Sequence, residues 1–331
     1  MITERKQLLM KHIFVINPAA GKENSYQTIR TALENLKTPV DYELYLTQAP
    51  GDSTAYIRNY CREHANERLR FYACGGDGTL NEVANGVVGH DNASLGCYPC
   101  GSGNDFVKYY GGKKAFLDVA ALVEAPEESI DLMRVGNKYA INATHFGFDS
   151  SVAQTMTNVR RKKLIGGKNA YTTGVVVGLC KAMKNECKVW VDGELLNPDG
   201  SILLCTVANG QYVGGSFRCA PRSLDNDGML EVCLVHPLSH LTFLRLMHAY
   251  TVGEHLSDPK FASRLIYRRG KSIRVEAPRG FVYCFDGELI RQNEFTVEAV
   301  PRAIRFAVPR NALPIMGDGH IPQSADEYAT V

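Results

Sequence analysis

The chain has 331 residues, of which 45% are hydrophobic and 22% are charged, and its 37 lysines and arginines nearly balance its 35 acidic residues. This length predicts two domains, and a net charge of +2 argues against a dedicated nucleic-acid-binding protein. The best apolar run, residues 174–180, is far shorter than the ~20 residues that a membrane span needs. The N-terminal segment lacks the apolar core of a secretory signal, so we expect a cytoplasmic protein with reduced cysteines.

The first third of the chain alternates predicted strands and helices. Strands are predicted at 13–16, 42–46, 69–74 and 95–98, and helices at 26–36, at 53–67 with Ser53 as N-cap, after the glycine loops and at 116–123. This alternation favours a doubly wound parallel sheet, in which ligands bind beyond the carboxyl ends of the strands. Three polar loops, 17–22, 74–79 and 100–105, follow predicted strands and can converge on one crevice.

From about residue 130 the pattern changes to short β-rich runs separated by turn signals such as Asp192-Gly193 and Asp227-Gly228. The predicted strands are 129–135, 138–142, 188–191, 202–208, 229–235, 272–276, 281–285 and 294–300. This pattern predicts a mainly antiparallel second domain with helical insertions near 150–184 and 237–257, and a loosely held tail at about 311–331.

The glycine-rich stretch at 75–79, Gly-Gly-Asp-Gly-Thr, lies between a predicted strand and a predicted helix. Its glycines let the backbone approach a ligand, and the first N–H groups of a helix favour anions. Asp77 repels phosphate unless a metal ion or a transferable proton intervenes, so the loop indicates phosphoryl transfer. The structural alternative is a tight turn in which Thr79 and Glu82 form a capping box.

Other nucleotide and metal motifs fail. Gly270-Lys271-Ser272 has Leu265 where a P-loop needs its first glycine, and Gly101-Ser102-Gly103 lacks the third glycine of a dinucleotide fingerprint. Cys97 and Cys100 have the spacing of a metal or redox pair, but no second pair accompanies them.

Several separated motifs, in order, resemble the diacylglycerol kinase catalytic-domain family, particularly its soluble bacterial lipid kinases, and more distantly the sphingosine, ceramide and NAD kinases. The resemblance covers about residues 11–310. The motifs are Asn17-Pro18 with Gly21-Lys22, Gly75 to Thr79 with Asn81-Glu82, Gly101 to Phe106, Asn142 with Gly147-Phe148-Asp149, Asn209-Gly210, Asp225 to Leu230, and Asp286-Gly287-Glu288. The glycine-aspartate-glycine loop alone is shared with NAD kinases, whereas the ordered set is more specific.

The resemblance implies an α/β nucleotide-binding domain at 1–130, completed by about 303–331, and an antiparallel β-sandwich lipid-substrate domain at 131–302. The family's active site lies in the cleft between these domains. The implied ATP-binding residues are Asn17, Pro18, Gly21, Lys22, Gly75, Gly76, Gly78, Thr79, Asn81, Gly101, Ser102 and Asn104.

The resemblance also implies that Asp77, Asp105 and Glu288 gather where the γ-phosphate of ATP meets a lipid hydroxyl. Phosphoryl transfer needs charge neutralisation and in-line positioning more than covalent help. One carboxylate can accept the hydroxyl proton while others hold Mg²⁺. Glu288 is the favoured base and Asp77 the favoured organiser of metal and nucleotide, although these two roles can be exchanged.

A second Mg²⁺ is implied at Asp225, Asp227 and the carbonyl of Met229, because alternating carboxylates in a tight turn suit a hard cation. The structural alternative is an Asx-rich turn between two strands. One departure from the family concerns the first loop, where Ala20 stands in place of a common serine and removes a hydroxyl donor.

The leading hypothesis is therefore an ATP-dependent lipid kinase that converts diacylglycerol to phosphatidic acid in phospholipid metabolism. The alternatives are a kinase of a sphingoid lipid or of NAD, and a catalytically inactive lipid-binding protein. The expected partners are the lipid substrate, a membrane surface contacted peripherally through the basic run at 160–163, and a second copy in a homodimer, with no nucleic acid.

Overall fold

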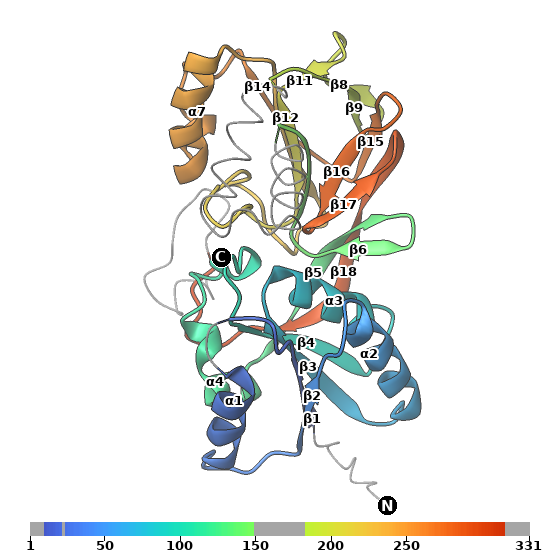
Figure 1. Ribbon diagram of the computed structural model, residues 1–331, viewed down its shortest axis with the longest axis vertical. Coiled ribbons are helices and arrows are strands. Elements are labelled where there is room, and N and C mark those ends of the chain that lie inside the picture. The colour runs from blue at the N-terminus through green and yellow to red at the C-terminus, as the bar shows by residue number, and fades with distance from the viewer. Residues whose placement is uncertain (1–9, 22–23, 149–182, 315–331) are drawn as a thin grey trace, which may run out of the picture. The chain divides into compact units, whose positions relative to one another are not determined.

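A computed structural model describes residues 10–21, 24–148 and 183–314 (Figure 1). Within these residues the chain divides into two compact units. Unit 1 runs to Ile130 and resumes at Arg302, and unit 2 comprises Asp131–Pro301. The basic run at 160–163, Asp149 and Lys22 lie outside the described residues. Within the described ranges, no helix is both long and apolar enough to cross a membrane.

Unit 1 is built on a parallel sheet with the strand order β18-β4-β3-β1-β2. Its strands are β1 (Met10–Ile16), β2 (Tyr42–Leu46), β3 (Arg68–Gly75), β4 (Ala93–Pro99) and the last part of β18 (Glu294–Ala307). Its helices are α1 (Ser25–Glu34), α2 (Asp52–Glu63), α3 (Asp77–Val87) and α4 (Val119–Val123), with short turns η1 (Phe106–Lys108) and η2 (Ala115–Leu117). Strands β3 and β4 are buried almost throughout, as central parallel strands are. The predicted parallel sheet is confirmed.

The predicted N-cap of the second helix is wrong, and the capping box that was the structural alternative for the glycine loop does not form. Ser53, the expected N-cap, lies inside α2, which begins at Asp52 after Gly51. Ser53 is buried, and its hydroxyl donates a 2.5 Å hydrogen bond to Glu82 on α3. Glu82 therefore links two helices instead of forming a capping box with Thr79, and the N-cap of α3 makes no side-chain hydrogen bond.

Unit 2 contains an antiparallel six-stranded sheet with the order β14-β13-β12-β7-β16-β17. These strands are β14 (Leu265–Gly270), β13 (Leu230–Val235), β12 (Leu204–Ala208), β7 (Ala143–Gly147), β16 (Val282–Phe285) and β17 (Glu288–Arg291). A second antiparallel group joins β10 (Glu194–Leu195), β9 (Lys188–Val191), β15 (Ser272–Glu276) and β18. Strand β5 (Glu127–Val135) pairs with β18 and with β6 (Lys138–Ala140), and β8 (Asn185–Glu186) pairs with β11 (Ser201–Ile202).

The central strands of the six-stranded sheet are buried on both faces. On β13, Val232 packs into one hydrophobic cluster with Ile273 of β15, and Cys233 packs into another with Phe243 of α7 (His240–Val252). A strand that alternates between two apolar clusters is buried throughout, as β13 is. The prediction of an antiparallel second domain is confirmed, although β7, β14 and β17 were not among the predicted strands.

Candidate active site

Three loops of unit 1 meet beyond the carboxyl ends of the adjacent strands β1, β3 and β4. The backbone N–H of Asn17 donates to the Cys74 carbonyl (3.0 Å). The N–H groups of Cys100 and Gly101 both donate to the Gly75 carbonyl (3.0 and 3.1 Å). The loops that the sequence placed after these strands are therefore in direct contact.

Glycine is required at the closest approach between two of these loops. A Cβ on Gly101 would lie 2.3 Å from the Cα of Gly76, which is closer than real atoms come. Gly21 has φ +80°, and a Cβ there would lie 2.8 Å from the Cys100 carbonyl oxygen. The three loops can pack this tightly only because these positions carry no side chain.

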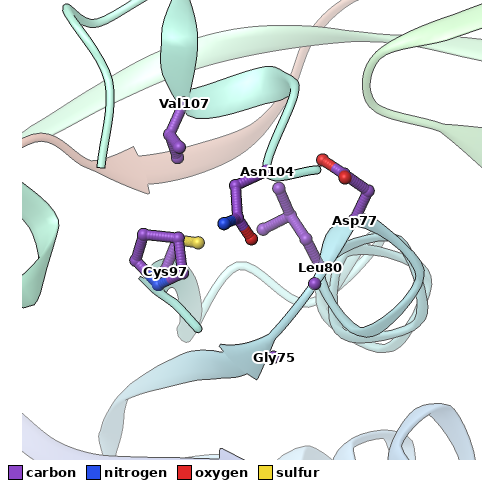
Figure 2. Close-up of a pocket in the computed structure, with 8 residues that line it drawn as sticks. Gly75, Asp77, Leu80, Cys97, Asn104 and Val107 are labelled. Carbon is purple, nitrogen blue, oxygen red and sulfur yellow. The ribbon is translucent and has the colours of Figure 1, made fainter. Parts of the chain in front are cut away.

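Asp77 begins α3 and turns toward the loop after β4 (Figure 2). One of its carboxylate oxygens accepts the backbone N–H of Asp105 at 2.6 Å. The other faces Gly103: a Cβ there would lie 2.7 Å from Asp77 Oδ2 and 3.7 Å from Asp105 Oδ2. Burial raises the pKa of Asp77, and the charge of Asp105 raises it further. Two carboxylates this close fit a divalent cation, which would offset their mutual repulsion.

The loop after β4 holds its polar groups against these acids. Lys108 Nζ pairs with Asp105 at 2.5 Å, a contact at i,i+3 spacing that the sequence interpretation did not assign. Asn104 has φ +50° and donates to the Gly101 carbonyl at 2.7 Å, while its buried Oδ1 accepts no hydrogen bond. A small hollow here is lined by Gly75, Gly76, Asp77, Leu80, Cys97, Pro99, Asn104 and Val107 (Figure 2). The Asn104 oxygen is therefore an unused hydrogen-bond acceptor among these loops.

The other predicted nucleotide residues are spread over the same loops. Asn17 donates to the Thr79 hydroxyl at 3.1 Å, which ties the first loop to the second. Pro18, Gly78 and Ser102 are exposed at the loop surfaces, whereas Asn81 lies one turn into α3. The predicted nucleotide-binding residues that the structure describes thus lie together at one edge of unit 1. Their role in binding ATP stays a prediction.

Glu288 belongs to unit 2, where it begins β17 and is exposed. Its carboxylate pairs with Lys138 Nζ at 2.6 Å. The neighbouring Asp286 has φ +43° and accepts the backbone N–H groups of Ile141 (2.6 Å) and Ala143 (2.8 Å). Asp286 therefore holds the turn that presents Glu288, and an approach of Glu288 to Asp77 stays a prediction.

The acidic turn of unit 2 has the Asx geometry that was the alternative to a metal site. Asp227 accepts the Met229 N–H at 3.0 Å, and its other oxygen pairs with the guanidinium of Arg269. Arg269 also pairs with the buried Glu231 at 2.8 Å. A metal ion bound to Asp225, Asp227 and the Met229 carbonyl would compete with Arg269 for Asp227, and this site stays a prediction. Within the described ranges, His, Cys, Asp and Glu side chains form no group of three suited to a metal ion.

This combination of a parallel α/β unit and an antiparallel β unit is the fold of the NAD kinase and diacylglycerol kinase class. The family model for the diacylglycerol kinase catalytic domain matches residues 11–135. The model for the YegS C-terminal NAD kinase beta sandwich-like domain matches residues 142–308. The chain therefore belongs to the diacylglycerol kinase catalytic-domain family.

Relatives match over nearly the whole chain. A "Probable lipid kinase YegS-like" from Alcanivorax borkumensis is 26% identical, over 95% of this chain and 99% of its own length. A diacylglycerol kinase from Bacillus subtilis is 28% identical, over 83% of this chain and 88% of its own. The crystal structure of a diacylglycerol kinase from Bacillus anthracis superposes with a TM-score of 0.64 at 19% identity, covering 90% and 96% of the two chains. That structure supports the fold alone.

Proposed function

We propose that this protein is an ATP-dependent lipid kinase that transfers the γ-phosphate of ATP to the hydroxyl of diacylglycerol, giving phosphatidic acid. The observation that carries the proposal is the pair of carboxylates, Asp77 and Asp105, which face Gly103 among three backbone-lined loops. Family membership adds support, because the Bacillus subtilis relative is named a diacylglycerol kinase.

The loops suit the binding of phosphate groups. Their glycines expose backbone N–H groups, and the N-terminus of α3 adds a partial positive charge. Asp77 and Asp105 would hold Mg²⁺, which supplies charge neutralisation at the phosphates. The Asn17–Thr79 hydrogen bond would keep the first two loops in register around the nucleotide.

The transfer requires a base for the lipid hydroxyl. As its proton passes to the base, the hydroxyl oxygen forms a bond to the γ-phosphorus, and the bond from that phosphorus to the ADP oxygen breaks. Glu288 is the proposed base, because its carboxylate is exposed at the start of β17, beside the Lys138 ammonium. Asp77 is the alternative, because a raised pKa suits proton acceptance.

Phosphate transfer from labelled ATP with Mg²⁺ tests this proposal. The acceptors are diacylglycerol, sphingosine and ceramide in mixed micelles, with NAD as a soluble acceptor. We expect label in diacylglycerol and its loss in Asp77→Asn and Glu288→Gln. Glu276→Gln is the matched control, because Glu276 is also an ion-paired acid of unit 2, with Arg274 as its partner.

Other outcomes point to the alternatives. Label in a sphingoid lipid alone would change the acceptor, and label in NAD alone would make the chain an NAD kinase. Lipid binding without transfer to any acceptor would favour an inactive lipid-binding protein. A homodimer and a cytoplasmic location with peripheral membrane contact remain predictions.

A further inference from the structure

Helix α7, labelled in Figure 1, has an unusually apolar outer face in unit 2. Leu241, Leu244 and Val252 are 61%, 58% and 43% exposed. In the described ranges the other large hydrophobic residues exposed to this degree are Leu46 and Leu117, both in unit 1. Most of the exposed large apolar side chains that the structure describes are therefore on this single helix.

These side chains are not required for packing the helix onto unit 2. The inner face of α7 already buries Phe243, Leu246 and Tyr250 in a hydrophobic cluster against the six-stranded sheet. At 100° per residue, Leu241, Leu244 and Val252 fall on the opposite side, around His248. The helix thus has one apolar face that is buried and a second that is exposed.

The exposed face of α7 carries a positive charge and no negative one. Residues 240–252 contain no Asp or Glu, and Arg245 lies on the same side as the exposed leucines. The segment that follows contains two acids, Glu254 and Asp258, and two bases, Lys260 and Arg264, so it adds no net charge. Exposed leucines with a basic residue beside them suit a helix that lies in a membrane interface.

The exposed area argues against a second copy of the chain as the occupant. Three side chains of this size expose roughly a few hundred Å² together, whereas a stable dimer buries about 800 Å² per partner. A bilayer surface needs no complementary protein surface and accepts a small apolar patch flanked by cations.

We propose that the exposed face of α7 is a membrane-contact surface that inserts Leu241 and Leu244 among the headgroups of a bilayer containing anionic lipid. Arg245 would remain at phosphate level while its alkyl chain packs beside the leucines. The inference rests on the proposed function in one respect, because an acceptor that resides in a bilayer gives the enzyme a reason to bind there.

Vesicle co-sedimentation of the full chain tests the inference without any activity measurement. The probes are phosphatidylcholine vesicles with and without phosphatidylglycerol. Each substitution, Leu241→Ser and Leu244→Ser, is expected to lower the partition coefficient by about tenfold. Arg245→Gln is expected to weaken binding only to the vesicles that contain phosphatidylglycerol, and less so at high salt.

The control is Leu46→Ser with Leu117→Ser, which removes two exposed leucines (39% and 37%) from unit 1 and should leave vesicle binding unchanged. The double variant of Leu241 and Leu244 should keep the wild-type melting temperature. It should also keep activity toward a short-chain diacylglycerol dissolved as monomers, and lose activity toward diacylglycerol in vesicles.

Unchanged vesicle binding by the α7 double variant would overturn the inference, as would equal losses in the unit 1 control. A concentration-dependent dimer that the α7 variant abolishes would assign the face to a second copy instead. If the wild-type protein binds vesicles through α7 but phosphorylates no lipid, the proposed function fails while the membrane surface stands.

Discussion

The two units neutralise their acidic groups in different ways. In unit 1, Asp77 accepts a backbone N–H and adjoins Asp105, so the single charge of Lys108 faces two carboxylates. In unit 2, the Asp227 carboxylate is paired with the guanidinium of Arg269 and with the Met229 N–H. The comparison contrasts two neighbouring acids near one ammonium in unit 1 with an acidic turn of unit 2 whose counter-charge is a guanidinium, and the binding of a metal ion by Asp77 and Asp105 stays a prediction.

The largest effect is expected from Asp77→Asn. Loss of the carboxylate should lower kcat by about 10³-fold, because charge neutralisation at the phosphates is the main requirement of the reaction. The melting temperature should stay unchanged or rise, since burial and the Asp105 charge both oppose ionisation of Asp77 in the folded protein. Steady-state kinetics measure kcat, and thermal unfolding measures the melting temperature. The control is Asp118→Asn, because Asp118 is an acid outside the site, at the N-cap of α4. Activity within tenfold of wild type would contradict the role of Asp77.

Next in size is the effect of Gly101→Ala. The new Cβ would collide with backbone at Gly76, so the loops must separate, and we expect a loss of about 2–4 kcal/mol in unfolding free energy together with most of the activity. Urea unfolding measures the loss of unfolding free energy. Gly78→Ala is the matched control for stability, because nothing lies within 4 Å of a Cβ at that position. Equal stability of the two variants would show that the contact between loops is not needed.

Arg269→Gln tests the acidic turn directly. It leaves Asp227 and the buried Glu231 without their cation, so the unfolding free energy at neutral pH should fall by about 2 kcal/mol. Arg268→Gln, one residue earlier on β14, should cost much less because its guanidinium donates to a backbone carbonyl, that of Tyr267, and not to a carboxylate. Titration with Mg²⁺ then compares the variant with the wild type. If Mg²⁺ raises the melting temperature of the variant more than that of the wild type, the turn can bind the predicted metal once Arg269 is gone. If Mg²⁺ raises both melting temperatures equally, Arg269 does not compete with the ion.

The last prediction concerns the pH dependence of stability and Glu231. Burial raises its pKa to about 7, against the opposing charge of Arg269. The folded protein therefore holds this proton more tightly than the unfolded chain, so stability falls as pH rises from about 4.5 to about 7, by at most about 1.4 kcal/mol per pH unit. Glu231→Gln should remove this dependence of the unfolding free energy on pH. Urea unfolding at about pH 4.5 and about pH 7 measures it. An unchanged slope in the variant would assign it to another group.

Local patterns in the sequence were sufficient for the elements of unit 1. The predicted strand at residues 42–46 matches β2, and the polar loops lie after β1, β3 and β4 as expected. Hydrophobic periodicity and glycine placement act over a few residues, so they can be read without knowing the fold. The same patterns missed β14, whose last residues include two exposed arginines, and β17, a four-residue strand after a tight turn.

The sequence by itself determined the order of strands and helices, the glycine loops and the acids that belong to them. Only the tertiary structure decided how those groups are partnered: Ser53 with Glu82, Lys138 with Glu288, and Arg269 with Asp227. The members of these pairs are 29, 150 and 42 residues apart in the chain. The physical reason is that a side chain's partner depends on which elements pack together, and no local pattern records that choice.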